Sequence, residues 1–310
     1  MERLTQAVKI PAPALAISAM LSVQLGSALS TQLFQALTPA GTAWLRLTVA
    51  GAVLLVLARP PLFRLPWLLL RNTLGLGVVT GLLMLMFIEA IARIPLGTAV
   101  AIEFLGPLSV AALRCHRQSA LLWPALALGG VLGLTQPWVG HLDLVGCGFA
   151  VASGISWGGY ILLTQRVGSQ LPGMQGLAIS LGTAAVTLAP CGLMAAISGL
   201  TVPIALQGIG VAILVPLLPF AFEMLALRRM RVAAFGTLMA LEPAIATVLG
   251  LVILTQRPDL LQLVGVAAVV VAGIGAQRSA PAPVPDDGTA LSRSSRSDVG
   301  SIRPAASGQR

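Results

Sequence analysis

Two isolated glutamates, each in an apolar segment beside a proline, are the residues of this sequence best suited to chemistry. Glu103 lies in VAIEFLGPLSV (100–110) with Pro107 four residues later, and Glu242 lies in LMALEPAIATV (238–248) directly before Pro243. If these segments are membrane helices, a charge at mid-depth costs roughly 2.5–3.5 kcal/mol on insertion scales, so each glutamate must face a cavity or a partner. A carboxyl group buried in this way can also take up and release protons near neutral pH.

The two prolines predict an interruption in each helix at a similar depth. Pro107 lacks the N–H that would bond the carbonyl of Glu103, and Pro243 does the same to the carbonyl of Met239. Each helix then exposes a backbone acceptor in mid-membrane, which is tolerated only where protein or water satisfies it. The alternative is that the kinks serve packing and that the glutamates pair with a fixed cation.

Arg46 is the arginine that falls inside a predicted span, in TPAGTAWLRLTVAG (38–51). It could neutralise a glutamate, anchor its helix by reaching the membrane surface, or bind a substrate carboxylate through two parallel hydrogen bonds. Two further acids, Glu223 and Glu89, lie nearer the ends of their segments. They could reach the interface and need no substrate.

Polar residues recur at helical spacing in two otherwise apolar segments. Such a stripe faces protein or water and not lipid, although hydrogen bonding between helices would produce it as well. The first stripe consists of Gln24, Ser27, Thr31 and Gln35; the second consists of Ser153, Ser156, Tyr160 and Thr164, with Trp157 alongside.

The composition places these residues in a membrane. Of the 310 residues, 56% are hydrophobic and 9% are charged, and the mean hydropathy is +0.92. No soluble domain of this size buries so much apolar surface, so lipid must cover part of it. The period-two alternation of a β-barrel is missing, and apolar stretches of about 20 residues recur along the chain. We therefore predict an all-α integral membrane protein with ten transmembrane helices, at 12–35, 40–58, 68–91, 94–113, 120–139, 144–166, 174–197, 203–227, 231–254 and 259–277.

The net charge of +9 indicates topology and gives no reason to expect a nucleic-acid partner. With a cytoplasmic N-terminus, the inside loops collect most of the Lys and Arg residues, while the outside loops hold only Arg93 and Arg257. This bias predicts that both termini of a multi-pass protein lie in the cytoplasm. The two histidines and three cysteines show no metal-binding spacing, so neither a metal nor a cofactor is expected.

The chain contains an internal repeat. Laying Pro107 on Pro243 aligns RIPLGTAVAIEFLGPLSVAAL (93–113) with RMRVAAFGTLMALEPAIATVL (229–249). A five-helix unit enters the membrane on one side and leaves on the other, so its duplicate must be inverted, as in many secondary transporters. We predict a first repeat over 1–139, an inverted second repeat over 140–277 and a disordered cytoplasmic tail over 278–310.

Four segments carry a resemblance to a known family: ALTPAGTAWLRLTVAG, IPLGTAVAIEFLGPLSVA, ISWGGYILLTQRVG and FGTLMALEPAIATVLGLVIL. They resemble the EamA-type branch of the drug/metabolite transporter superfamily, and most of all its threonine/homoserine exporter (RhtA-type) group, over essentially residues 12–277. The resemblance implies ten helices in two inverted halves, a place in the inner membrane of a bacterial cell, and proton-driven export of amino acids or related metabolites. One departure is Thr255-Gln256, where the family commonly has Gly-Glu. The positions that match the family are Arg46, Glu103, Pro107, Tyr160, Gln165, Arg166, Glu223, Glu242 and Pro243.

The leading hypothesis is an exporter of small amino acids such as threonine or homoserine, driven by protons. Glu103 or Glu242 would bind the ammonium group and Arg46 the carboxylate, with Tyr160 and Trp157 shaping the pocket. The alternative is an exporter of drugs or other amphipathic metabolites, but few of the aromatic residues lie near the glutamates in the sequence. A membrane scaffold would not need repeated acids at mid-depth, and the motifs HExxH and GxSxG of enzymes are missing. A single pair of glutamates does not form the ring of charge expected of a channel.

Overall fold

The computed structural model of the chain describes residues 10–61, 65–114, 121–139, 143–168, 171, 174–227, 229–230 and 232–279. Within these ranges the chain consists of helices joined by short connections, with no β-strand. The predicted tail, residues 278–310, lies outside the described ranges apart from its first two residues, which end the last helix.

The helices coincide with the apolar segments, and three of them begin directly after a proline, at Pro11, Pro66 and Pro95. Proline suits a helix start because the first N–H groups of a helix have no intrahelical acceptor. In chain order the elements are α1 (Ala12–Ser30), the 3₁₀ turn η2 (Thr31–Leu33), α2 (Phe34–Ala58), α3 (Trp67–Ile91), α4 (Leu96–Glu103), α5 (Leu105–Arg114), α6 (Leu122–Thr135), the 3₁₀ turn η5 (Pro137–Val139), α7 (Leu144–Gly168), α8 (Met174–Gly199), α9 (Val202–Ala212), the π-helical segment η6 (Ile213–Leu217), α10 (Leu218–Leu227), α11 (Val232–Met239), α12 (Glu242–Leu254) and α13 (Leu260–Ser279).

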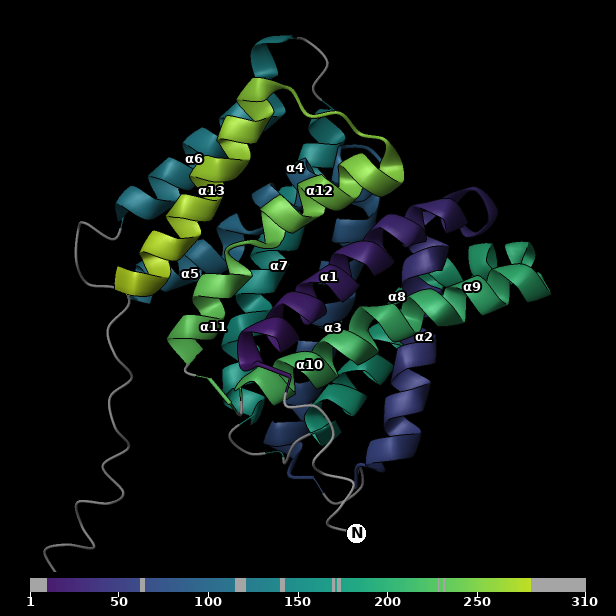
Figure 1. Cartoon of the computed structure of the whole chain (residues 1–310). Coiled ribbons are helices and arrows are strands. Elements are labelled where there is room, and N and C mark those ends of the chain that lie inside the picture. The colour runs from purple at the N-terminus through teal and green to yellow at the C-terminus, as the bar shows by residue number, and fades with distance from the viewer. Residues whose placement is uncertain are drawn as a thin grey trace, which may run out of the picture. The chain divides into compact units, whose positions relative to one another are not determined.

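Eight helical stretches of the described chain are long and apolar enough to cross a membrane, against the ten that the sequence predicts. The first two predicted spans form one helical stretch of 47 residues, Ala12–Ala58, and α6 has 14 residues. A straight helix of that first length would measure about 70 Å, more than twice the bilayer core of about 30 Å. Instead the chain bends at Thr38 (φ 59, ψ 165), directly before Pro39, and Figure 1 shows α1 and α2 running in different directions.

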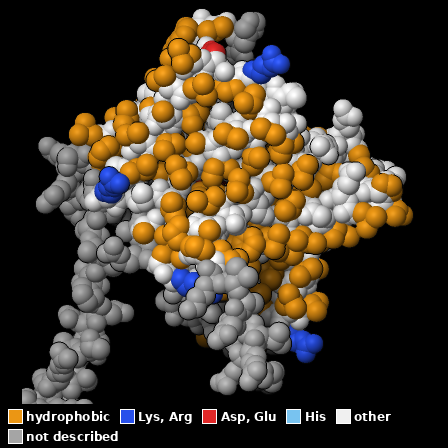
Figure 2. All heavy atoms as spheres, in the orientation of Figure 1, with side chains coloured by type: hydrophobic (Ala, Val, Ile, Leu, Met, Phe, Trp, Pro, Cys, Tyr) orange, Lys and Arg blue, Asp and Glu red, His pale blue; other side chains and the backbone are white. Residues whose placement is uncertain are grey.

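The outer surface is that of a protein in lipid. Large apolar side chains such as Val56, Leu113 and Val186 are strongly exposed, and Figure 2 shows hydrophobic side chains covering one face with the Lys and Arg side chains toward its margins. Soluble monomers rarely expose so large an apolar area. The chain is therefore a multi-pass membrane protein.

Three membrane stretches are interrupted in their middle. The predicted breaks are present: α4 ends at Glu103, with α5 beginning at Leu105, and α11 ends at Met239, with α12 beginning at Glu242. The third break lies in the segment between α9 and α10. There Val215 has extended backbone angles (φ −147, ψ 114) and precedes a cis bond to Pro216, a break that sequence analysis did not predict.

The helices pack in pairs that bring distant parts of the sequence together. α2 packs on α8, α3 on α7 and α8, α6 on α13, α1 on α10, and α4 on α12. The closest approach relevant to the acids is that of Gly106 to Gly154, where a Cβ added at Gly106 would collide with the Gly154 backbone. Small residues at such crossings let membrane helices meet through their backbones, and this one fixes the α4–α5 break against α7.

Candidate functional site

One cavity of about 370 Å³ lies among the interrupted helices, a size typical of pockets for small molecules. It collects all six residues that the sequence predicted for substrate binding or proton coupling, from five different membrane stretches. The cavity is lined by Val23, Gln24, Ser27, Arg46, Leu83, Met84, Phe87, Glu103, Trp157, Tyr160, Leu177, Val215, Pro216, Pro219, Phe220, Glu223, Phe235, Met239 and Glu242.

Glu103 is the last residue of α4, and its side chain is buried. Its carboxyl oxygen Oε1 lies 2.5 Å from Oγ of Ser153 on α7. The same hydroxyl lies 3.2 Å from the backbone carbonyl oxygen of Leu83 on α3. Ser153 therefore joins three membrane stretches at the position of the first acid.

Glu242 is the first residue of α12 and is buried as well. The side chain of Gln24 on α1 lies near it, and the carboxyl oxygen Oε2 has no hydrogen-bond partner. A buried carboxylate oxygen without a partner carries a desolvation cost, which a cationic group in the cavity would offset. Glu242 thus lines the cavity and has one carboxyl oxygen without a partner.

Arg46 lies in the middle of α2 with 1% of its surface exposed. Its Nη1 donates to Oγ of Ser30 at 3.1 Å, and Ser30 donates in turn to the carbonyl of Gly26 at 2.6 Å. The Nε and Nη2 atoms have no partner. This position contradicts an anchor at the membrane surface, and within the described residues no carboxylate is paired with the guanidinium. Two donors of the guanidinium remain open.

The other predicted lining residues lie where the cavity is less buried. Trp157 meets the ring of Phe104 edge-on, with centroids 6.4 Å apart and an interplanar angle of 69°. Tyr160 follows on the same helix, and Glu223 comes from α10. Contact between Trp157 and Phe104 sets an aromatic wall directly beside the break that follows Glu103.

Aromatic side chains are more abundant at the acids than the sequence suggested. Phe87, Phe220 and Phe235 line the cavity together with Trp157 and Tyr160. The expectation of few aromatic residues near the glutamates was wrong, because separation along the chain does not measure distance across a helix bundle. Pro216 and Pro219, inside an apolar run, were the sequence signal that α10 is redirected toward the site.

The two predicted kink prolines act on the backbone and do not line the cavity. Pro243 lies in the first turn of α12, and Pro107 is the third residue of α5. Proline is tolerated in a first turn because its missing N–H has no intrahelical acceptor there. Each proline therefore begins the helix that follows the break.

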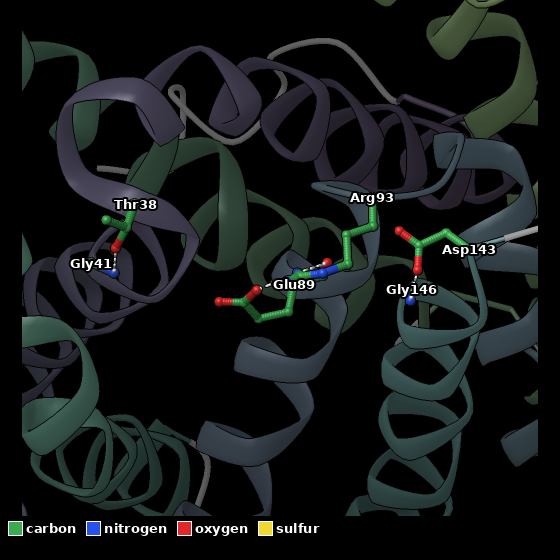
Figure 3. A network of polar contacts seen from close by, with 6 residues as sticks. All are labelled: Thr38, Gly41, Glu89, Arg93, Asp143 and Gly146. Carbon is green, nitrogen blue, oxygen red and sulfur yellow. Dashed lines mark hydrogen bonds and ion pairs between the residues drawn. The ribbon is translucent and has the colours of Figure 1, made fainter.

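Glu89 lies apart from the cavity. It pairs with Arg93 one turn later at 2.5 Å, and Figure 3 shows these two side chains meeting on the same helix end. The Arg93 guanidinium also covers the ring of Phe149, 4.9 Å from its centroid. Nearby, Asp143 caps α7 by accepting a hydrogen bond from the backbone N–H of Gly146 at 2.8 Å. These contacts secure helix ends.

The pair that departs from the family pattern also has a local role. Thr255 ends α12 in a left-handed conformation (φ 55), and Oε1 of Gln256 accepts the backbone N–H of Leu96 at 3.1 Å. The amide thereby satisfies a free donor at the start of α4. Over the described residues, no group of three or more His, Cys, Asp and Glu side chains could hold a metal ion.

Interrupted membrane helices around a cavity that holds buried charged side chains are typical of transporters, and this is the class that the fold and the site indicate. Comparison with known proteins gives the family. A model of the EamA-like transporter family matches residues 144–275. The threonine/homoserine exporter RhtA of Escherichia coli (strain K12) is 36% identical over 264 residues, which cover 83% of this chain and 88% of that protein. The exporter of the same name from Salmonella typhimurium (strain LT2) is 34% identical over the same coverage.

The chain therefore belongs to the EamA-like transporter family and, within it, to the RhtA-like group. A protein of known crystal structure is similar in fold, with a TM-score of 0.57 and 22% sequence identity over 86% of this chain and 96% of the other. That likeness concerns the fold alone.

Proposed function

We propose that the protein is a secondary active exporter of small amino acids, threonine and homoserine among them, in a bacterial inner membrane. One observation carries the proposal: a single cavity holds open N–H donors on Arg46 and an open carboxylate oxygen on Glu242. A zwitterionic amino acid supplies a carboxylate to the first and an ammonium group to the second, and both contacts are charge-assisted. The names of the relatives RhtA support amino acids as the substrates. They favour transport over an intramembrane enzyme or a scaffold.

We infer ten crossings arranged as two inverted halves, residues 1–139 and 140–277. Two observations support this. First, α4 ends at Glu103 and α11 ends at Met239, positions that coincide when Pro107 is laid on Pro243. Second, the packing is the same when equivalent helices of the two halves are exchanged. α2 packs on its equivalent α8, and α6 packs on its equivalent α13. The contact of α3 with α7 corresponds in the same way to the contact of α10 with α1. In this architecture the bend at Thr38 separates the first two crossings, and residues 278–310 follow the last.

The cavity is proposed to face the cytoplasm. Two of its lining residues, Glu223 and Phe235, come from the second half of α10 and the first half of α11. The connection between these helices contains Arg229, and basic loops favour the cytoplasmic side. An exporter loads its substrate from that side, so the described state is the one expected before transport.

Proton coupling is proposed at Glu103. A hydroxyl group carries one proton, whereas the Leu83 carbonyl can only accept. The contacts of Ser153 to Leu83 and to Glu103 are therefore both hydrogen bonds only when Glu103 is the neutral acid and donates to Ser153. Loss of the proton turns the Ser153 hydroxyl toward Glu103 and releases Leu83 on α3. In this way the charge of one acid changes a contact between membrane stretches, which is what coupling requires.

The test is counterflow in proteoliposomes that carry the purified protein. Liposomes preloaded with unlabelled threonine should accumulate labelled threonine or homoserine, and an imposed pH difference should drive net movement. Protein-free liposomes are the control. The proposal fails if neither amino acid shows saturable exchange.

The aromatic lining favours a second candidate, an exporter of other amphipathic metabolites. Five aromatic side chains, Phe87, Trp157, Tyr160, Phe220 and Phe235, face the cavity, and such surfaces hold flat or cationic ligands well. Cells that overproduce the protein separate the two candidates. Resistance to excess homoserine supports the first, whereas resistance to cationic dyes supports the second.

A further inference from the structure

Ser27 is a buried hydroxyl that the proposed binding of carboxylate and ammonium groups does not use. It lines the cavity one helical turn after Gln24 on α1, with 1% of its surface exposed, and Gln24 has 2% exposed. Neither the Ser27 Oγ nor the Gln24 Oε1 has a hydrogen-bond partner. The two residues therefore offer a hydroxyl and an amide oxygen side by side on one wall.

The open state of Ser27 is unusual within this chain. Serine and threonine in membrane helices ordinarily bond the carbonyl four residues earlier, and here Ser30, Thr80 and Thr183 do so, to Gly26, Leu76 and Ile179. Ser27 makes no such bond to Val23. A buried polar group without a partner is costly, so the site is complete only when something in the cavity bonds to it.

Gln24 lies close to the proposed site of the ammonium group. Its side chain comes near enough to Glu242 to act on that carboxyl group, and because a carboxylate can only accept, the amide nitrogen is the end that suits Glu242. The amide oxygen has no hydrogen-bond partner. Gln24 thus joins the wall that carries Ser27 to the proposed site of the ammonium group.

We propose that Ser27 and Gln24 form a subsite for the side-chain hydroxyl of the substrate, so that the transporter selects hydroxylated amino acids. The hydroxyl of the substrate donates to the Gln24 oxygen and accepts from the Ser27 hydroxyl. This inference rests on the proposed function, because Arg46 and Glu242 must orient the amino acid first. The substrate is then held at its carboxylate, its ammonium group and its hydroxyl. An amino acid of the same shape with a methyl group in place of the hydroxyl leaves Ser27 and Gln24 buried and unpaired.

The experiment measures equilibrium binding to the purified full-length protein with two matched ligand pairs, threonine against valine and homoserine against norvaline. The members of each pair have the same size and differ in a hydroxyl or a methyl group. For the wild type we expect the hydroxylated member to bind at least about tenfold more tightly. In Ser27→Ala this preference should shrink by about tenfold, while valine and norvaline bind as well as before or better. Unchanged binding of those two ligands also serves as the measure of correct folding.

Ser22→Ala is the matched control. Ser22 lies on the same helix, but its hydroxyl donates to the carbonyl of Leu214 at 2.9 Å and does not line the cavity. Its replacement should leave the preference intact. If Ser27→Ala keeps the wild-type preference, or weakens all four ligands equally, the subsite is refuted while the exporter proposal stands. If the wild type binds none of the four, the proposed function fails and the subsite with it.

Discussion

The two helix breaks carry the same acid in opposite electrostatic settings. Glu103 is the last residue of α4, whereas Glu242 is the first residue of α12. The N-terminal end of a helix favours a negative charge and the C-terminal end disfavours it. The dipoles of these helices therefore act on the two carboxyl groups in opposite senses.

The partners of the two acids differ in the same sense. Glu103 meets the Ser153 hydroxyl, and the backbone beside it packs tightly on α7 through Gly106 and Gly154. Glu242 keeps one carboxyl oxygen open to the cavity. The comparison teaches that repetition of a motif need not repeat its role. In the proposed function, Glu103 is the acid that takes up a proton, and Glu242 is the acid that binds a cationic ligand.

The largest expected effect follows from neutralising Glu242. Glu242→Gln should weaken threonine binding at least about thirtyfold, because the ammonium group then loses the carboxylate proposed to pair with it in a buried site. Counterflow should fall in proportion. Glu89→Gln is the matched control, since Glu89 pairs with Arg93 outside the cavity. If Glu242→Gln binds threonine as tightly as the wild type, the proposed difference in role between Glu242 and Glu103 is refuted.

Neutralising Glu103 should separate binding from coupling. Glu103→Gln keeps a group that can donate to Ser153, so it resembles the neutral acid at every pH. We expect threonine counterflow within about threefold of the wild type, but no net transport driven by a pH difference. Both rates are measured in the same proteoliposomes. Undiminished gradient-driven transport in this variant would show that the proton binds elsewhere.

A smaller effect is expected from Ser153, the residue that joins Glu103 to α3. Ser153→Ala removes a positioning hydroxyl and should lower the ratio of gradient-driven transport to counterflow by about fivefold, the value of one ordinary hydrogen bond. Threonine binding should not change. Ser153→Thr retains the hydroxyl and should restore the ratio. A drop in binding that equals the drop in transport would instead indicate a purely structural role.

Much of this site could be predicted from the sequence, because its elements are costly. Glu103, Glu242 and Arg46 stand out since a charge in an apolar segment requires a reason, and Pro107 and Pro243 mark the breaks because proline cannot continue a helical bond pattern. All these residues lie where that logic expects them. The apolar residues that line the cavity could not be predicted in the same way.

Phe220 and Phe235 line the cavity from α10 and α11, which follow the break at Val215, and a phenylalanine in an apolar run has no signal of its own. Likewise the contrast between the acids depends on the partners that packing brings to each one. Ser153 lies 50 residues from Glu103, and no local pattern connects them. Long-range packing decides such contacts, whereas sequence periodicity reports the face of a single helix.

The smallest effect is expected at Asp259, an acid that has partners and lies outside the membrane stretches. It caps α13, accepting the Gln262 backbone N–H at 2.8 Å and the Gln136 side chain at 2.6 Å. These bonds, that of the Gln262 N–H first, hold the pKa of the Asp259 carboxyl below its ordinary value. Its contribution to stability is therefore fully present above the ordinary pKa of aspartate, about 3.9, and is lost as the pH falls through the lowered value.

Asp259→Asn should accordingly leave threonine binding and counterflow at the wild-type level at any pH above about 5. Asparagine is itself a good helix cap, so the thermal midpoint near neutral pH should change little, while its decline in acid becomes shallower. Binding and thermal unfolding across a pH series measure both. A loss of binding like that of Glu242→Gln would mean that acids matter to this protein wherever they lie. Wild-type binding would tie the effect to the open carboxyl oxygen in the cavity.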